Sequence, residues 1–433
     1  MCFHGSLSEL VYLHVPTFET QQLHQSSLLP PLISHHPTLC SLTFEKFLFN
    51  YYYYFFLLFL LSQGIFVLGL PFALVQSGYI GLVVLVLSAW VCNHTGRRLV
   101  ACLYEEEPRV RHSYQDIMDA CCKGLWPNWS VVGGCMINIS QVIELLMTCT
   151  LYLLVSTTLL CDSLSAVAPP RSACSLMSLM FLLPCLLLTD LRPVSMLSLL
   201  CSLAHILISL LVILYCLSCA SNWSWSFLSL SVDPEDFIVS VGVIIFSYTS
   251  QIFLPPLEGS MEDRGQFDTM YNWMTEFQMH IHIREVVTDN LPPNLRPVVN
   301  LCLLAKALLS YPLPFYSTAE ILQTCFLRGE IDRNLPRLSQ GVSCPTLMVR
   351  GALLLSSYLL SLLVPRFSLL MGLTGSVTGA AMTLILPCLF HLKLRWGRLT
   401  VQDRLIDMSI LSLGVVCSVA GVVCSVKRML EDL

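Results

Sequence analysis

The sequence predicts an all-α protein that crosses a membrane many times, and composition is the first observation behind this. Hydrophobic residues make up 55% of the 433 residues and charged residues only 12%, whereas soluble domains carry about 25% charged residues. The mean hydropathy is +0.70. So few polar residues cannot cover the surface of a soluble fold. We therefore expect lipid to surround most of the chain.

The second observation is a series of ten apolar stretches, each close to the length of about 20 residues that a membrane-spanning helix needs. The candidate spans are 47–77, 80–103, 133–161, 174–190, 194–219, 237–259, 297–327, 349–370, 371–392 and 405–426.

Two of these spans are interrupted, and this is the third observation. The first contains Gly64, Gly69 and Pro71, and the sixth contains the polar run 247–251 followed by two prolines. Irregular backbone at membrane depth is tolerated only where it lines a cavity or is buried in protein. One early break and another about five spans later indicate a transporter built from inverted repeats. The alternative is a pair of proline kinks.

Basic residues suggest the orientation of the chain. They follow the second span and the ninth, and they also lie in the connections near Arg192 and at 328–337. The positive-inside rule places these segments in the cytosol. The stretch 219–234, with a possible glycosylation acceptor at Asn222, is then lumenal or extracellular.

Several function classes are disfavoured. A net charge of -5 does not suggest a nucleic-acid partner. We find no phosphate-binding loop, nucleophile elbow or metal-ligand spacing, which argues against an ATP-driven pump and an enzyme, and we expect no cofactor and no metal. Most of the 20 cysteines lie in apolar runs, where they act as small hydrophobic residues, so free thiols are favoured over disulfides.

Several segments together resemble the amino acid/auxin permease family from about Gly64 to Leu430. The resemblance is carried by GIFVLGLPFALVQSGYIGL, QVIELLMTCTLYLLVS, VGVIIFSYTSQIFLPPLEGSM, AKALLSYPLPF and LLMGLTGSVTGA. It implies a LeuT-type inverted-repeat fold with eleven helices, and the exchange of lumenal protons for cytosolic GABA or glycine at synaptic vesicles. The partners implied are a small amino acid, protons and the lipid bilayer. The alternatives are a plasma-membrane neutral amino acid permease of the same fold and a transport-deficient paralogue.

The chain departs from the family pattern where the seventh helix belongs. Between Trp273 and Glu285 it has only MTEFQMHIHIR, and eleven residues that include Glu276 and Arg284 cannot cross about 30 Å of hydrocarbon. We therefore expect about ten of the eleven helices, and we expect the chain as written to be unable to transport.

Residues 1–63 do not match the family, which leaves 64–430 as the transporter domain. The run YYYYFFLLFLLSQ before Gly64 can be encoded by pyrimidine-rich codons ending in CAG, as the translated end of an intron would be. We therefore interpret 1–63 as an artefact of an incomplete gene model. The alternative is a genuine hydrophobic half-helix.

By resemblance, the substrate site lies between the two breaks. Helix N-termini at a break offer backbone N–H groups to a carboxylate. The alternative is that the glycines only allow close helix packing. Tyr311, beside Pro312, could bind substrate or pack at a kink. The other residues implied are Gly64, Val67, Gly69 and Leu70 at the first break and Phe246, Ser247, Tyr248, Thr249 and Ser250 at the second.

Three ionisable residues lie roughly 14–17 Å deep in their spans, and such residues are functional candidates by default. Glu144 is the candidate proton carrier, with a structural ion pair to Lys306 as the alternative. Lys306 could instead fill a cation site. His205 is favoured as a hydrogen-bonded buried residue over a proton relay. Glu258, at a helix end, is expected to be solvated.

Overall fold

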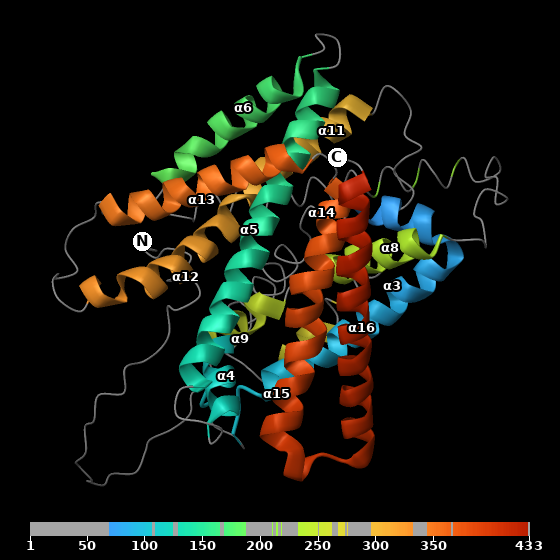
Figure 1. Ribbon diagram of the computed structural model, residues 1–433, viewed down its shortest axis with the longest axis vertical. Coiled ribbons are helices and arrows are strands. Elements are labelled where there is room, and N and C mark those ends of the chain that lie inside the picture. The colour runs from blue at the N-terminus through green and yellow to red at the C-terminus, as the bar shows by residue number, and fades with distance from the viewer. Residues whose placement is uncertain are drawn as a thin grey trace, which may run out of the picture.

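The computed structural model describes the chain in separate ranges. They are 69–105, 109–123, 129–164, 169–187, 233–249, 251–261, 267–272, 296–331, 344–364 and 367–431, with the single positions 210, 214, 218 and 275. The elements in these ranges are helices (Figure 1), and one isolated β-bridge joins Tyr104 to Arg109. The prediction of an all-α, multi-spanning membrane protein is confirmed.

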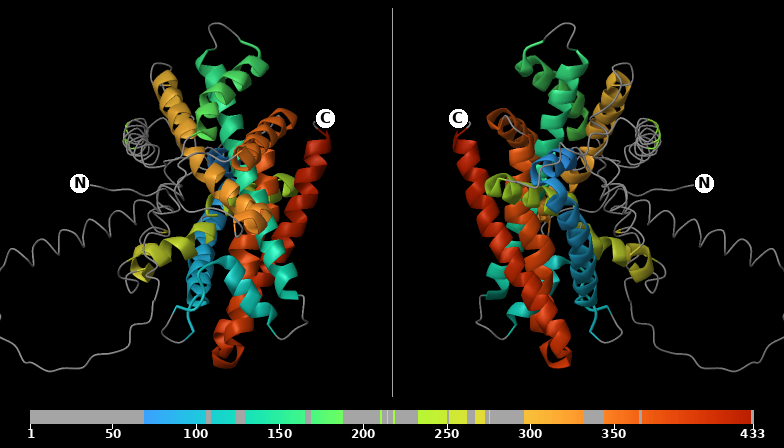
Figure 2. Two further views of the ribbon diagram at one scale, coloured as in Figure 1. Left: turned by 90° about the vertical axis from the view of Figure 1, so that its left-hand side faces the viewer. Right: turned by 90° about the vertical axis from the view of Figure 1, so that its right-hand side faces the viewer.

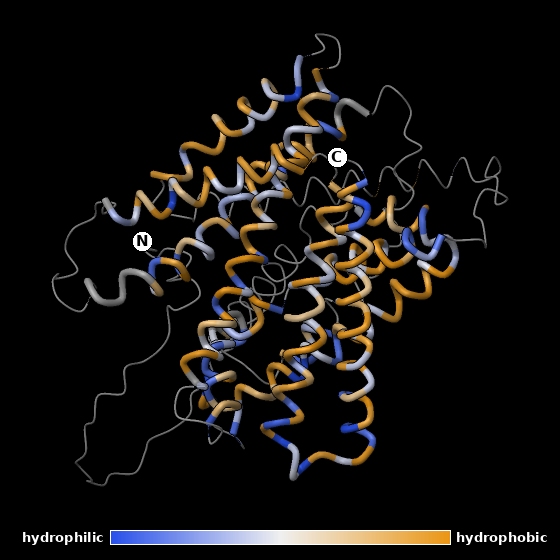
Figure 3. Tube along the Cα trace, in the orientation of Figure 1, coloured by the Kyte–Doolittle hydropathy of each residue, from blue (hydrophilic) through white to orange (hydrophobic). Residues whose placement is uncertain are grey.

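Seven helical segments in the described ranges are long and apolar enough to cross a membrane. Figure 3 shows apolar residues along their lengths, with hydrophilic residues near the turn that joins α15 to α16. They correspond to seven of the ten predicted spans. They are Phe72–Ala101, Val131–Ser163, Pro234–Phe253, Val299–Cys325, Pro345–Leu363, Phe367–Arg398 and Val401–Glu431.

The other three predicted spans are described less fully. A shorter apolar helix, Arg171–Leu186, matches the predicted span 174–190. The predicted spans 47–77 and 194–219 lie largely outside the described residues. The predicted boundary between the eighth and ninth spans was a few residues late, because the eighth helix already ends at Leu363 and the next begins at Phe367.

Helix α3 (Leu70–Ala101) contains a sharp kink at Gly78. This residue has φ 57° and ψ -147°, a conformation that glycine adopts far more easily than residues with a Cβ. Residues 70–77 and 79–101 are thus two helical segments, the end of the first predicted span and all but the last two residues of the second.

Helix α5 (Trp129–Ser163) is the centre of one group of helices (Figure 1). A buried cluster joins it to its neighbours and includes Cys149, Leu153, Tyr311, Phe315 and Leu354. The surrounding elements are α4 (Tyr114–Cys122), α6 (Arg171–Leu182) with η2 (Leu183–Leu186), α11 (Arg296–Ser310), α12 (Pro312–Ile331) and α13 (Cys344–Leu363).

A second group packs α8 and part of α3 against the C-terminal helices. One long helical segment contains two π-helical stretches, and α16 runs back along it, as Figures 1 and 2 show. The elements are α8 (Pro234–Ser247), α14 (Phe367–Thr374), η8 (Gly375–Gly379), η9 (Ala381–Ile385), α15 (Leu386–Arg395), η10 (Trp396–Arg398) and α16 (Val401–Glu431).

The cysteines of the described ranges are free thiols, as the sequence favoured. Cys121 lies on α4, outside the spanning helices, and is buried. Burial raises the pKa of its thiol to about 12. Because the thiolate is the reactive species, this cysteine is chemically inert near neutral pH.

Glycines allow α8, η8 and α16 to approach closely. A Cβ added to Gly375 would lie 2.0 Å from the carbonyl oxygen of Gly242, and one added to Gly421 would lie 2.0 Å from the Ser376 hydroxyl. Small residues of this kind are how membrane helices bring their backbones together.

We expect Gly375→Ala to destabilise the protein by at least about 1–3 kcal/mol, because the methyl group would meet backbone that cannot move aside. The matched control is Gly351→Ala on α13, where no atom lies within 4 Å of the added Cβ. There the substitution should be neutral or slightly stabilising, since alanine favours helix. Thermal unfolding in detergent, followed by size-exclusion chromatography, measures both variants. Equal melting temperatures for the two would contradict the close contact.

Candidate functional site

The second predicted break is present in the structure. Helix α8 ends at Ser247, and a short turn at Gln251–Phe253 (η5) leads into α9 (Leu254–Ser260). The polar run in the sequence correctly indicated where the helix would be interrupted. The break leaves Thr249 buried beside helices α5, α11 and α12.

A small cavity of about 30 Å³ lies next to this break. It has room for water, but it is far below the roughly 300–1,000 Å³ of ligand pockets. An amino acid could therefore enter only if the surrounding helices moved apart. The cavity is lined by Glu144, Leu145, Thr148, Tyr152, Thr249, Ile252, Phe253, Ser310, Leu313 and Pro314.

Among the residues that the structure describes, Glu144 is the only acidic one that lines this cavity. It is 3% exposed, and its Oε2 atom has no hydrogen-bond partner within the described part of the chain. Lys306 on α11 is also buried, but the ion pairs found among the described residues do not join it to Glu144. A carboxyl group at membrane depth is costly to keep and marks a candidate functional residue.

The walls of the two breaks meet in one buried cluster. It contains Leu70 from the start of α3 together with Phe246 and Tyr248 from the end of α8. Ser247 is buried as well, and its hydroxyl donates a hydrogen bond to the carbonyl oxygen of Ile244 at 2.7 Å. The structure thus brings Leu70, Phe246 and Tyr248 together, and among the described residues of the second break only Thr249 lines the cavity.

Gly69 and Tyr311 contact protein rather than the cavity. A Cβ on Gly69 would lie 2.6 Å from Sδ of Met371 and 3.1 Å from Val243. This close packing is the alternative that the sequence left open for the glycines. The hydroxyl of Tyr311 is 3.0 Å from the Ser357 hydroxyl, and its ring stacks on Phe315. The remaining sequence-predicted residues, Gly64, Val67, Ser250 and His205, lie outside the described residues.

The expectation that Glu258 is solvated was wrong. Glu258 is fully buried, and its Oε2 lies 3.1 Å from Nε of Arg109 in an ion pair. The Tyr104 hydroxyl donates to its other oxygen, and Arg109 also donates to the Pro255 carbonyl at 2.7 Å. The segment between α3 and α4 covers α9 and supplies the countercharge, which a reading of the α9 sequence alone could not reveal.

Gln251 ties the break to α3. Its side-chain amide donates to the carbonyl oxygen of Cys92 at 3.1 Å and to the Thr95 hydroxyl at 2.8 Å. The Tyr271 hydroxyl donates to the same carbonyl at 3.2 Å. These bonds hold the interrupted helix against α3 next to the cavity.

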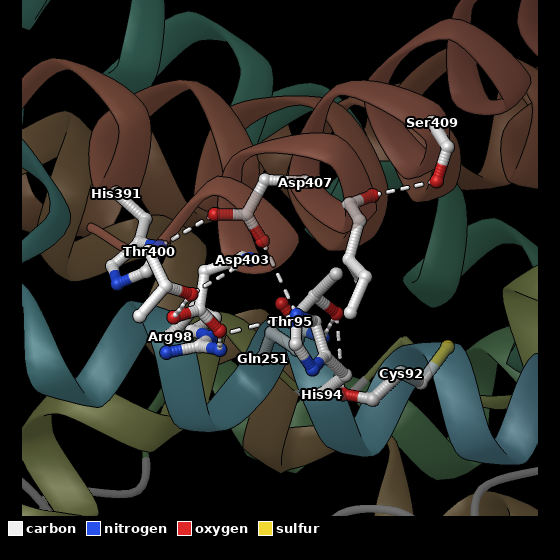
Figure 4. Close-up of polar contacts among 11 residues, drawn as sticks. Cys92, His94, Thr95, Arg98, Gln251, His391, Thr400, Asp403, Asp407 and Ser409 are labelled. Atoms are coloured by element: carbon white, nitrogen blue, oxygen red, sulfur yellow. Dashed lines mark hydrogen bonds and ion pairs between the residues drawn. The ribbon is translucent and has the colours of Figure 1, made fainter. Parts of the chain in front are cut away.

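Sequence reasoning missed a second buried polar group, drawn in Figure 4. Asp407 of α16 is fully buried between His391 of α15, at 2.6 Å, and His94 of α3, at 3.2 Å. Asp407 lies six residues after Val401, inside a predicted span. At about 1.5 Å per residue it is only roughly 3 Å deep in the predicted span 405–426, so the search for ionisable residues deep in their spans that selected Glu144 passed over it.

Comparison with known proteins gives a consistent family. The model for transmembrane amino acid transporter proteins matches residues 53–430. A vesicular inhibitory amino acid transporter of Xenopus tropicalis is 44% identical over 85% of this chain and 75% of its own length. The human protein of the same name is 42% identical, over 85% and 74%. A vesicular GABA transporter of Caenorhabditis elegans is 33% identical, over 86% and 78%.

We expect Arg109→Met to destabilise the fold by about 3–5 kcal/mol, because it leaves the Glu258 carboxylate buried without its countercharge. The control is Lys427→Met, which removes a charge from an exposed pair with Glu235 and should change stability little. Melting temperatures in detergent compare the two. If the Arg109 variant loses no more stability than the control, the buried pair does not stabilise the fold as described.

Proposed function

This chain belongs to the transmembrane amino acid transporter family, and on that premise we propose that, in a form with a complete seventh helix, it is a proton-coupled transporter that loads GABA or glycine into synaptic vesicles. The family consists of transporters, so the chain is not an enzyme. The names of its relatives support the vesicle membrane and the inhibitory amino acids. The observation that carries the proton coupling is the buried carboxyl of Glu144 beside the cavity.

The proposed mechanism depends on the Glu144 carboxyl group, which can bind either a proton or the ammonium group of the substrate but not both. An ionised Glu144 attracts the ammonium group of an amino acid from the cytosol. A proton from the lumen neutralises the carboxylate and removes that attraction. Because the same group cannot carry the proton and pair with the ammonium together, the two are exchanged in opposite directions. Thr249 and Ser310, which line the cavity with Glu144, supply hydroxyl groups to the substrate.

The substrate carboxylate binds at the breaks. The N-terminal end of α3 at Gly69 and Leu70 presents backbone N–H groups, the usual partners of a carboxylate at a broken membrane helix. The contacts between Leu70, Phe246 and Tyr248 bring this end close to the second break. This arrangement supports a LeuT-type fold in which inverted repeats move about a site between them.

Two alternatives differ in location or activity. A plasma-membrane neutral amino acid permease would have the same fold. Lys306, buried on α11, favours sodium independence if it fills a cation site. A transport-deficient paralogue is favoured by the short segment 274–284, where the family has its seventh helix. Localisation of a tagged chain distinguishes a plasma-membrane permease from a vesicular transporter. Measurement of amino acid flux distinguishes a transport-deficient paralogue from an active one.

We expect the chain as written to show no pH-driven uptake of GABA or glycine. Without a seventh helix the later spans would invert against the positive-inside rule, or a segment of eleven residues would have to cross the bilayer. A version with a family-like helix inserted at 274–284 should transport. Uptake into proteoliposomes with an imposed pH gradient compares the two at equal protein abundance. Equal uptake would mean that this helix is dispensable.

We expect Glu144→Gln, made in the transport-competent version, to abolish accumulation driven by the pH gradient, because glutamine cannot exchange a proton. Counterflow without a gradient tests whether the variant still binds substrate. The control is Glu105→Gln, at an exposed carboxylate paired with Arg111, which should transport normally. Normal accumulation by the Glu144 variant would remove Glu144 from the coupling mechanism.

A further inference from the structure

Two buried side chains and one partly buried side chain, from three helices, meet at the end of the molecule opposite the C-terminus. They are His94 of α3, His391 of α15 and Asp407 of α16, and we name them the His–Asp cluster (Figure 4). Asp407 is 0% exposed, and the side chains of His391 and His94 are 1% and 16% exposed. The basic residues nearby mark this end as cytosolic.

Among the described residues no arginine forms an ion pair with Asp407, although the charge of Arg98 acts on it from farther away. Arg98 of α3 donates to Asp403 at 2.5 Å, and the Thr400 hydroxyl donates to the same carboxylate at 2.7 Å. Arg395 of α15 donates to the carbonyl oxygen of Ala101 at 2.7 Å. Asp407 therefore relies on the two imidazoles as its direct partners.

Other titratable groups on the described neighbouring elements include acidic residues that are paired at a distance and two thiols. The acidic residues of α8, Glu235 and Asp236, pair with Lys427 and Arg428 at the far end of α16. The buried thiols of Cys388 and Cys102 are near Asp407. A single negative charge that is fully buried is costly unless it is neutralised. One proton on either imidazole would neutralise it.

The hydrogen-bond geometry at His94 provides two arrangements that differ by one proton. Nε2 of His94 lies 3.2 Å from Oδ1 of Asp407 and 3.4 Å from Nε of Arg98. Arginine only donates, so a bond from Arg98 requires a bare Nε2, whereas a bond to an ionised Asp407 requires a proton on Nε2. Binding or moving one proton therefore changes which neighbour His94 contacts.

We propose that the His–Asp cluster is a proton-binding site at the cytosolic end of α3, α15 and α16, separate from the cavity at Glu144. Within the part of the chain that the structure describes, no group of histidine, cysteine and acidic residues is arranged to hold a metal ion. The site joins α3 to the hairpin of α15 and α16, so a bound proton strengthens the contact between them. This proposal does not depend on transport.

The test measures the melting temperature of the purified full chain in detergent at pH 8 and pH 6. A ligand that binds the folded protein better than the unfolded chain stabilises it, so proton binding raises the melting temperature at the lower pH. Asp407→Asn keeps the shape but removes the charge that holds the proton. We expect this variant to lose about 2 °C or more of the rise between pH 8 and pH 6.

We expect His391→Gln and His94→Gln to lose part of the same pH-dependent rise in melting temperature. These two variants keep the proposal testable if the Asp407 variant fails to fold. The control is His112→Gln, at an exposed histidine outside the cluster, which should keep the full rise. A smaller pH-dependent rise in the cluster variants supports the proposal. A drop in melting temperature that is equal at both pH values shows that the cluster is only a structural contact, and overturns it. The melting temperatures at both pH values are measured without any transport of substrate.

Discussion

The close approach of the α8, η8 and α16 backbones is the contact on which both polar sites depend. Lipid provides little hydrophobic force between helices, so membrane helices associate through close packing. Gly242, Gly375 and Gly421 remove the side chains that would keep these helices apart. With α8 held in this way, its broken end brings Thr249 to the cavity. With α16 held, Asp407 is placed between α3 and α15.

Charged residues fasten α16 at both of its ends. Near the C-terminus, Arg428 pairs with Asp233 and Asp236 at the start of α8. Near the N-terminus, Asp403 pairs with Arg98 of α3. These pairs are partly exposed, and ion pairs that water can reach each contribute little to stability. Their arrangement nevertheless fixes how far α16 can slide along its neighbours, and so preserves the glycine contacts between them.

The sequence predicted the features that depend on local pattern. The spanning helices follow from apolar length, the interrupted sixth span from its polar run, and the burial of Glu144 from its depth in a span. What it could not predict depends on partners brought together by the fold. The Tyr311 hydroxyl faces Ser357 of α13, and Glu258 faces Arg109. No spacing within one helix indicates such a neighbour, because it comes from a different part of the chain.

The ion pair between Arg109 and Glu258 also has a consequence for the rate of a transport cycle. It fastens α9, which follows the broken end of α8, to the segment between α3 and α4. Any opening of the cavity that swings α9 away from this segment must separate two opposite charges inside the protein. Such a step has a large activation enthalpy, because the two charges separate before water can solvate them. A cycle that includes it would turn over slowly and would slow steeply on cooling.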